Sequence, residues 1–326
     1  MVTECNPRPP SKEAENCSTP REFLELFLNK DIMRIFREQT ILYAAQKNTD
    51  LSVTDDEILV LLGGLLLSGY AKYPNKMMFW SRQSDTPTIL ADIMRCNRFE
   101  SILRCFHLND NSKLDTTDRL YKVRPFLEVL EAQFKRHGAI DEDLCIDETS
   151  GYMLSFEIYV GKIEDPAKKF GLGGDTVLSL LTGAEIPPNP GYKIFFDNYF
   201  TSVKLLEHFS EMGYCATGTA RENRVDGCPL KPKSEMKKLE RGSYDYRTRK
   251  NVLLVRWNDN SVVTVATNYD GIDVGATKRW SREQRKHATV PQPKVVAHYN
   301  KGMGGVDNMD QQVATYRTRM RQRKWL

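Results

Sequence analysis

The sequence of 326 residues lacks the motifs of several common functional classes. Its seven cysteines include no C-x-x-C pair, so no zinc spacing can be read, and their odd number argues against a closed disulfide framework. The five histidines form no H-x-x-x-H pair, and there is no P-loop or dinucleotide-binding glycine fingerprint. No Ser/His/Asp or Cys/His triad stands out. Because the cysteines suggest no disulfide framework, a reducing compartment is the default expectation. Any catalytic or metal-binding chemistry must come from residues outside these motifs.

Long hydrophobic runs are also scarce. The longest, residues 59–67, is too short to span a bilayer and predicts a buried helix, so no membrane association is expected. The first residues contain no apolar stretch typical of a secretion signal. The formal net charge of +4 is mild, and this overall balance alone does not indicate a nucleic-acid partner.

The distribution of positive charge is more informative than its total. One cluster contains Lys278, Arg279, Arg282, Arg285 and Lys286 around Trp280, and the other contains Arg317, Arg319, Arg321, Arg323 and Lys324. Basic clusters beside an aromatic residue suit contact with phosphates and bases. A solvated surface explains either cluster equally well when it is taken alone.

Hydrophobic spacing divides the first half of the chain into a tail and a helical region. Residues 1–20 are polar and rich in proline, which predicts a disordered tail. Residues 21–138 show helical periodicity, with a capping box formed by Thr54 and Glu57. They are expected to form an all-α domain.

From residue 139 the pattern changes to that of an α/β fold. Residues 152–160 read as a strand, 175–181 as the start of a helix, and 201–212 as a helix closed by Gly213. Between these helices an apolar strand ends at Asp197. The alternation predicts an α/β sheet over 139–215, and the end of this core over 294–326. Residues 216–293 predict a β-rich insertion that contains a hairpin of 252–257 and 261–266.

Acidic residues stand at the ends of predicted elements. Asp147 ends a short apolar run, Asp197 ends a strand, and Asp307 and Asp310 lie in the first turn of a helical pattern after a glycine-rich turn. Ligands gather at the carboxyl ends of strands in α/β sheets, and carboxylates hold Mg²⁺ there. Two such ions can activate a nucleophile and stabilise the leaving oxygen of a phosphodiester. Ordinary turn and helix-dipole preferences are the alternative explanation of each acid.

At these acids the sequence resembles the piggyBac transposase family, in particular its cellular branch of piggyBac transposable element-derived proteins. The matching segments are residues 21–27, 67–70, 78–80, 98–102, 107–111, 122–125, 197–202, 216–219, 256–259 and 304–311. The segments that contain Asp197 and Asp307 are distinctive in combination.

The resemblance implies a ribonuclease-H-like core interrupted by a β-rich insertion, and a helical domain for dimerisation and DNA binding. It implies three catalytic aspartates, Asp147, Asp197 and Asp307, with Asp310 as a further acid, and Mg²⁺ as the cofactor. It also implies cut-and-paste transposition through DNA hairpins at TTAA targets, a DNA partner, a homodimer and a nuclear location.

Two departures from the family pattern predict an incomplete core. A strand-bearing segment that follows the first aspartate in the family is missing between Glu148 and Thr149, and the C-terminal zinc module is not present. We expect residues 152–160 to fold back on 143–147 as a hairpin that turns at 149–151. The sequence therefore favours a transposase-derived DNA-binding protein with a degenerate core. An active Mg²⁺-dependent transposase and a non-enzymatic chromatin or protein-interaction module are the alternatives.

Overall fold

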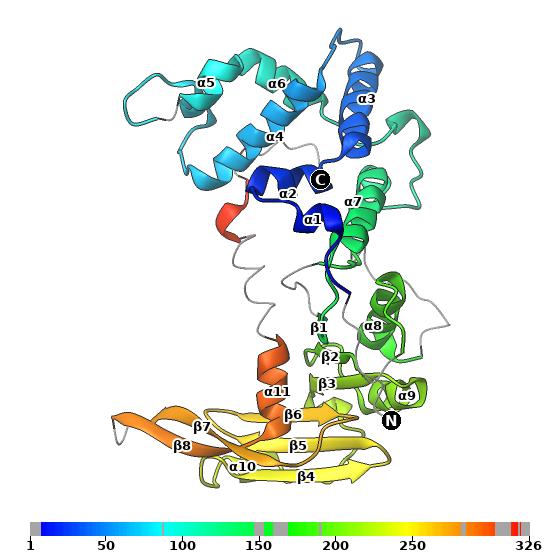
Figure 1. Ribbon diagram of the computed structural model, residues 1–326, viewed down its shortest axis with the longest axis vertical. Helices are drawn as coiled ribbons and strands as arrows, with labels where there is room; N and C mark the ends of the chain where they lie inside the picture. The colour runs from blue at the N-terminus through cyan, green and yellow to red at the C-terminus, as the bar shows by residue number, and fades with distance from the viewer. Residues whose placement is uncertain are drawn as a thin grey trace. The chain divides into compact units, whose positions relative to one another are not determined.

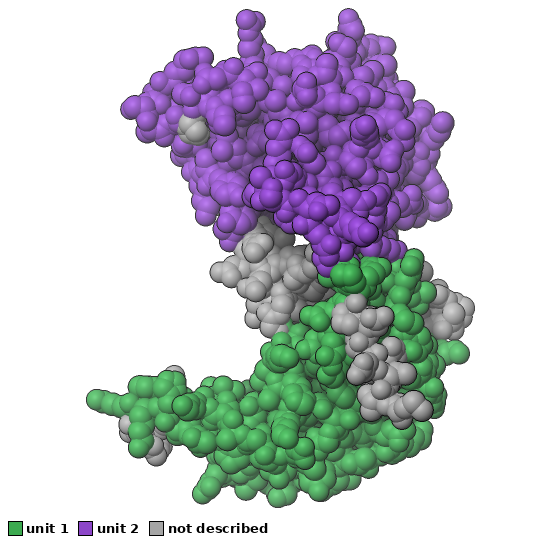
Figure 2. Space-filling model, viewed as in Figure 1, with its two compact units in different colours: residues 1–9, 139–157, 162–309 green, residues 10–138, 158–161, 310–326 purple. Residues whose placement is uncertain are grey.

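A computed structural model of the chain describes residues 8–86, 88–146, 153–158, 169–188, 191–281, 285–303, 314–318 and 320. The chain forms two compact units, which are distinguished by colour in Figure 2. Unit 1 comprises Met1–Pro9, Ala139–Glu157 and Lys162–Met309, and unit 2 comprises Pro10–Gly138, Ile158–Gly161 and Asp310–Leu326. Within the described ranges, no helix is both long enough and apolar enough to cross a membrane.

Unit 2 is helical (Figure 1). Its helices are α1 (Lys12–Glu15), α2 (Pro20–Phe27), α3 (Lys30–Gln46), α4 (Asp55–Tyr70), η1 (Lys76–Trp80), α5 (Ile89–Ile93), α6 (Cys96–Cys105), η2 (Asn111–Lys113) and α7 (Arg124–His137). The predicted capping box is confirmed, because Thr54 accepts from the amide of Glu57 and Glu57 accepts from the amide of Thr54. The core of this unit lies where α3 packs against α4, α6 and α7.

Part of the expected disordered tail is ordered instead. Residues 12–15 form α1, and Arg136 on α7 donates to Glu13 at 2.6 Å. Ser11 caps α1 and its hydroxyl lies 2.8 Å from Nδ1 of His137. These contacts are long-range, so the local composition of residues 8–19 did not reveal them.

Unit 1 is built on a mixed sheet with the strand order β1-β2-β3-β6-β5-β4. Its strands are β1 (Asp143–Ile146), β2 (Lys193–Phe196), β3 (Cys215–Thr219), β4 (Tyr244–Arg249), β5 (Val252–Asn258) and β6 (Val262–Thr267). The first three strands are parallel and the others pair antiparallel. A separate antiparallel pair consists of β7 (Val274–Ser281) and β8 (Lys286–Pro293).

Helices cover both faces of this sheet (Figure 1). They are α8 (Gly171–Gly183) and α9 (Val203–Met212) on one face and α11 (Lys294–Gly302) on the other. The short helices η3 (Glu222–Arg224) and α10 (Lys233–Met236) also belong to unit 1. One apolar cluster joins α8 and α9 to one face, which includes Leu254 of β5. A second cluster joins α11 and β8 to the opposite face, which includes Val255. Because neighbouring residues of a strand point to opposite faces, β5 is buried on both sides.

Three local predictions for unit 1 are confirmed and one is wrong. The strand that ends at Asp197 and the hairpin of β5 and β6 are confirmed, and so is the helix closed by Gly213, whose φ of 89° is left-handed. The expected hairpin of 152–160 on 143–147 is wrong over the described part. Residues 153–158 form no strand, and β1 pairs in parallel with β2. The strand composition of this segment was a local signal that the tertiary structure overrides at residues 153–158.

Candidate functional site

The register of β1 and β2 sets the position of the candidate site. These strands are parallel, and Ile146 and Phe196 are partners in the ladder. In the sequence, Asp147 follows Ile146 and Asp197 follows Phe196. The carboxyl ends of parallel strands meet at one edge of a sheet, which is where ligands bind in α/β folds. The two strands that lead to the first two predicted acids are therefore direct neighbours.

Asp197 is held in a tight turn, which we call the Asp197 turn (residues 197–201). Its Oδ1 accepts a hydrogen bond from the amide of Tyr199 at 2.6 Å, and its carbonyl accepts from the hydroxyl of Thr201 at 2.7 Å. No described residue donates to Oδ2. One oxygen of the carboxylate thus shapes the turn, as the turn preference of aspartate predicts, and the other is open to a hard cation. The structural and the metal-binding explanations of Asp197 are compatible.

Two arginines, one that caps η3 and one at its end, donate hydrogen bonds to the Asp197 turn. Arg221 donates to Oδ1 of Asn198, and Arg224 donates to the carbonyl of Tyr199. The guanidinium of Arg224 also lies 5.8 Å from the centre of the Tyr199 ring. Charged donors make stronger hydrogen bonds than neutral ones, so these contacts restrain the backbone just after Asp197.

The position of η3 depends in turn on a buried arginine of β5. Arg256 has no exposed surface, and its guanidinium contacts both carboxylate oxygens of Glu222 at 2.8 and 3.0 Å. Its remaining donors reach the carbonyl of Lys231 and the hydroxyl of Thr264. In the sequence, Arg256 was identified only as part of a segment that resembles the family. A single arginine in the otherwise apolar run of β5 was the signal that could have revealed it.

The end of α11 approaches both strands that lead to the acids. A Cβ atom added to Gly302 would lie 2.3 to 2.5 Å from ring carbons of Phe195 on β2. The Sγ of Cys145 on β1 lies 3.2 Å from the Sδ of Met303. Cys145 and Phe195 are ladder partners, one residue before the ends of their strands. The chain thus leaves α11 beside this edge, four residues before Asp307 in the sequence.

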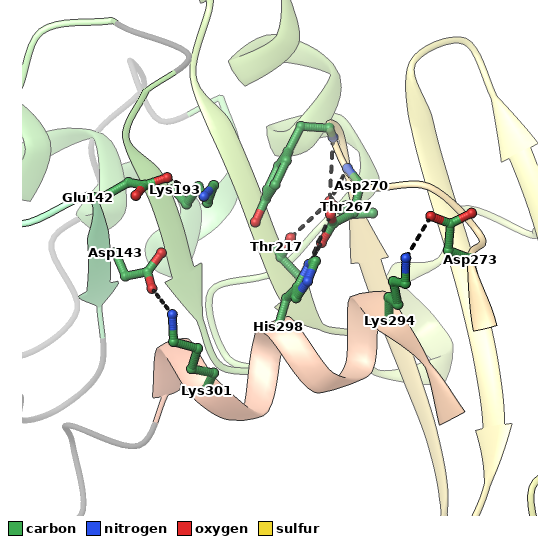
Figure 3. Close-up of polar contacts among 11 residues, drawn as sticks. Glu142, Asp143, Lys193, Thr217, Thr267, Asp270, Asp273, Lys294, His298 and Lys301 are labelled. Carbon is green, nitrogen blue, oxygen red and sulfur yellow. Dashed lines mark hydrogen bonds and ion pairs between the residues drawn. The ribbon is translucent and has the colours of Figure 1, made fainter. Parts of the chain in front are cut away.

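Polar contacts along one face of α11 orient the helix (Figure 3). Lys294 pairs with Asp273 at 3.2 Å and Lys301 with Asp143 at 3.5 Å. Between them, Nδ1 of His298 lies 3.0 Å from a carboxylate oxygen of Asp270. On the buried side, Val295 and Val296 pack in the second apolar cluster. This helix was not predicted. Its amphipathic pattern is short, and its acidic partners lie on two distant segments of the chain, β1 and the connection between β6 and β7.

The described residues contain only one of the four predicted acids. Asp147, Asp307 and Asp310 lie outside them, so their geometry with Asp197 stays a prediction. Within the described part of the chain, no group of three or more His, Cys, Asp or Glu residues is arranged to hold a metal ion.

Three of the eight predicted DNA-binding residues lie within the described ranges. Lys278 is exposed on β7, whereas Arg279 donates to Asp259 at 3.0 Å and so has a structural partner. Arg317 is exposed. Arg282, Arg319, Arg321, Arg323 and Lys324 lie outside the described residues.

Comparison with known proteins identifies the family. A family model described as "Transposase IS4", of the piggyBac type, matches residues 19–150 and 148–326. The chain therefore belongs to the piggyBac-type transposase family, and the resemblance inferred from the sequence is confirmed.

Two human proteins are similar over most of this chain. PiggyBac transposable element-derived protein 2 is 35% identical over 343 positions, covering 94% of this chain and 58% of its own length. PiggyBac transposable element-derived protein 3 is 35% identical over 353 positions, covering 97% and 59%. The chain thus spans under three fifths of the length of these relatives.

A solved structure shows the same mixed α/β fold. It is the cryo-EM structure of a piggyBac transposase synaptic complex with hairpin DNA, and it matches with a TM-score of 0.72 and 18% identity. The match covers 98% of this chain and 73% of the solved chain.

The alignment lengths also show that this chain lacks residues that its relatives contain. Both alignments run over more positions than the 326 residues of this chain, so the relatives contain residues without a counterpart here. The family model matches in two pieces that meet at residues 148–150. This is the junction at which the sequence analysis placed a missing segment.

We predict that Gly302→Ala destabilises unit 1. The added methyl group would overlap the ring of Phe195, which is 1% exposed and has no room to move. Such overpacking costs about 1–3 kcal/mol, which exceeds the gain of roughly 1 kcal/mol at most from alanine in a helix. Urea unfolding followed by circular dichroism measures the change.

Gly271→Ala is the matched control, because a Cβ atom there meets nothing within 4 Å. It should leave the unfolding midpoint nearly unchanged. Equal stability of Gly302→Ala and the parent would contradict the close packing of α11 on β2.

Proposed function

We propose that this protein is a transposase-derived DNA-binding protein with a ribonuclease-H-like core that is degenerate beside its first acid. The observation that carries the proposal is the convergence at one sheet edge. The ladder pair of Ile146 and Phe196 leads to Asp147 and Asp197, and the end of α11 leads towards Asp307. The family membership makes DNA the expected partner, and the solved relative is itself a complex with hairpin DNA.

The core of the proposal is the arrangement of β1, β2 and β3. Three parallel strands with α8 and α9 in the intervening segments support a ribonuclease-H-like core, and the antiparallel strands between residues 216 and 293 support the insertion. The degenerate state is supported by the junction at 148–150 and by the position of β1. Among the described residues, β1 pairs only with β2 and forms an edge of the sheet.

A divalent cation is part of the proposed function. The open Oδ2 of Asp197 fits a Mg²⁺ ligand, and Asp147, Asp307 and Asp310 would supply the other carboxylates. The ion would supply Lewis-acid stabilisation of the phosphodiester oxygens. The part of this chain is to hold the carboxylates in register at the sheet edge. The family resemblance also supports homodimers and a nuclear location.

An active transposase is the second candidate, and one observation favours it. The Asp197 turn is fully braced by Arg221 and Arg224, as a turn with a role in positioning a ligand should be.

We predict that Asp197→Asn weakens binding of Mn²⁺ by about tenfold or more. The side-chain oxygen of asparagine still accepts the hydrogen bond from the backbone amide of Tyr199, so the turn persists. The negative charge that attracts the cation is lost. Loss of even an outer-shell partner typically costs roughly 10- to 100-fold in metal affinity. Isothermal titration calorimetry measures the change, and binding by the parent is itself expected to be weak.

Asp50→Ala removes an exposed acid of the helical unit and serves as the control of equal charge. It should bind Mn²⁺ as the parent does. Identical titrations of Asp197→Asn and the parent would remove Asp197 from the proposed site.

We predict that replacing Arg319, Arg321 and Arg323 by alanine flattens the salt dependence of DNA binding. Each phosphate contact contributes about 0.9 to the slope of log K against log salt, because binding releases counterions. Fluorescence anisotropy with a duplex at several salt concentrations gives the slope. The control replaces Lys204, Lys237 and Lys238, which are exposed and equal in charge. If both triple variants keep the parent slope, the C-terminal cluster is only a solvated surface.

We predict that the chain does not excise a family-type transposon in cells. A catalytic group misplaced by about 1 Å can cost on the order of a hundredfold in rate, and the junction at 148–150 directly follows Asp147. Inserting the corresponding segment of a human relative after Glu148 should matter more than any point change.

A transposon-excision reporter distinguishes the three functions. Excision by the chain as it stands, abolished by Asp197→Asn, would show an active transposase. Absence of both excision and DNA binding would favour the non-enzymatic interaction module. DNA binding without excision is the result that the proposal expects.

A further inference from the structure

The hairpin of β7 and β8 has one packed face and one open face. Thr277, Arg279, Ala288, Val290 and Gln292 are buried or half-buried. The other face carries Ala276, Lys278, Trp280, His287, Thr289 and Pro291, and all six are exposed. Ladder partners share a face, so Trp280 lies beside His287 and Lys278 beside Thr289. We call these six residues the open hairpin face.

The packed face anchors the hairpin. Arg279 and Arg241 both donate to the carboxylate of Asp259, at 3.0 and 2.6 Å. A further donor of Arg241 reaches the carbonyl of Trp280 at 3.2 Å. Near the other end, Nε1 of Trp257 donates to the carbonyl of Pro291 at 2.9 Å. The backbone beneath Trp280 is therefore fixed, although its side chain faces solvent.

Trp280 is exposed to an unusual degree for its type. It is 54% exposed, while Trp257 in the same unit is 3% exposed. The ring of Trp280 meets that of His287 edge to face, with the centroids 5.4 Å apart. Exposing a large aromatic side chain on an anchored strand gains nothing for folding, which suggests a role in binding.

The described charged residues on the exposed side of the hairpin near Trp280 are all basic. Lys278 lies two residues away on the same face, and Arg285 and Lys286 are exposed where β8 begins. The described residues of the hairpin include no Asp or Glu. An anchored indole among cations is complementary to a partner that offers flat rings and negative charge together, as a nucleic-acid strand with unstacked bases does.

We propose that the open hairpin face binds unpaired bases of a single-stranded nucleic acid, with a base stacked on Trp280 and phosphates near Lys278, Arg285 and Lys286. This inference rests on the proposed DNA-binding function and adds a preference for single strands. In a duplex the bases stack on one another and offer no free ring face to an indole. Duplex binding can use the charges of the hairpin but not Trp280.

The test compares the full chain with Trp280→Ala and Trp280→Phe. Fluorescence anisotropy measures binding to a labelled 20-nucleotide dT strand and to a labelled duplex of equal length. Trp280→Ala should weaken single-strand binding about fivefold or more and leave duplex binding within about twofold. Trp280→Phe should keep most of the affinity for the single strand, because phenylalanine also stacks.

Two further variants separate stacking from other effects. Tyr246→Ala removes an exposed aromatic residue of β4 and should change neither affinity. Thr289→Glu places a carboxylate beside Lys278 on the open face, and it should weaken single-strand binding even if Trp280→Ala folds poorly. Thermal unfolding of each variant confirms that it is folded.

The results that would overturn the single-strand inference differ from those that would overturn the proposed DNA-binding function. If the parent binds neither strand nor duplex, the proposed DNA-binding function fails. If the parent binds DNA but Trp280→Ala and Thr289→Glu bind the single strand as the parent does, only the inference is overturned. Competition by poly-glutamate that matches competition by dT would also overturn it, because the face would then recognise charge without bases.

Discussion

The parallel pairing of β1 with β2 is the constraint on which the candidate site depends. It brings the ends of two strands, distant in sequence, to one edge in a fixed register. A shift by one residue would turn the side chains after Ile146 and Phe196 to opposite faces. The close packing of Gly302 on Phe195 then fixes the end of α11, from which the chain continues to the third acidic segment. These contacts are made by apolar residues, so packing sets the register of the two strands that lead to Asp147 and Asp197 in the sequence.

The buried Arg256 connects the antiparallel half of the sheet to this edge. It holds Glu222, and the same short helix presents Arg221 and Arg224 to the Asp197 turn. A buried guanidinium that loses its partner typically costs about 3–5 kcal/mol, although the half-exposed Glu222 lowers that figure here. Strands that carry none of the predicted acids therefore contribute to the geometry around one of them.

Features with local causes could be predicted from the sequence, and features with distant causes could not. The capping box of Thr54 and Glu57 and the left-handed Gly213 each depend on a few neighbouring residues, and both were predicted correctly. The helix α11 was missed because its partners come from distant parts of the chain: Asp143 from β1, and Asp270 and Asp273 from the connection before β7. The strand predicted at 152–160 shows the converse case. Its local composition favoured a strand, but the described residues 153–158 pair with no described strand.

The basic clusters illustrate how a strand redistributes charge that looks uniform in the sequence. Lys278 and Arg279 are adjacent, yet the two-residue period of β7 sends them to opposite faces. Arg279 is neutralised by Asp259 and anchors the hairpin, while Lys278 remains exposed beside Trp280. One arginine of the cluster thus supports the surface on which Lys278 is exposed. The charge available to a partner is set by the sheet face on which each residue lies, which the count of lysines and arginines does not reveal.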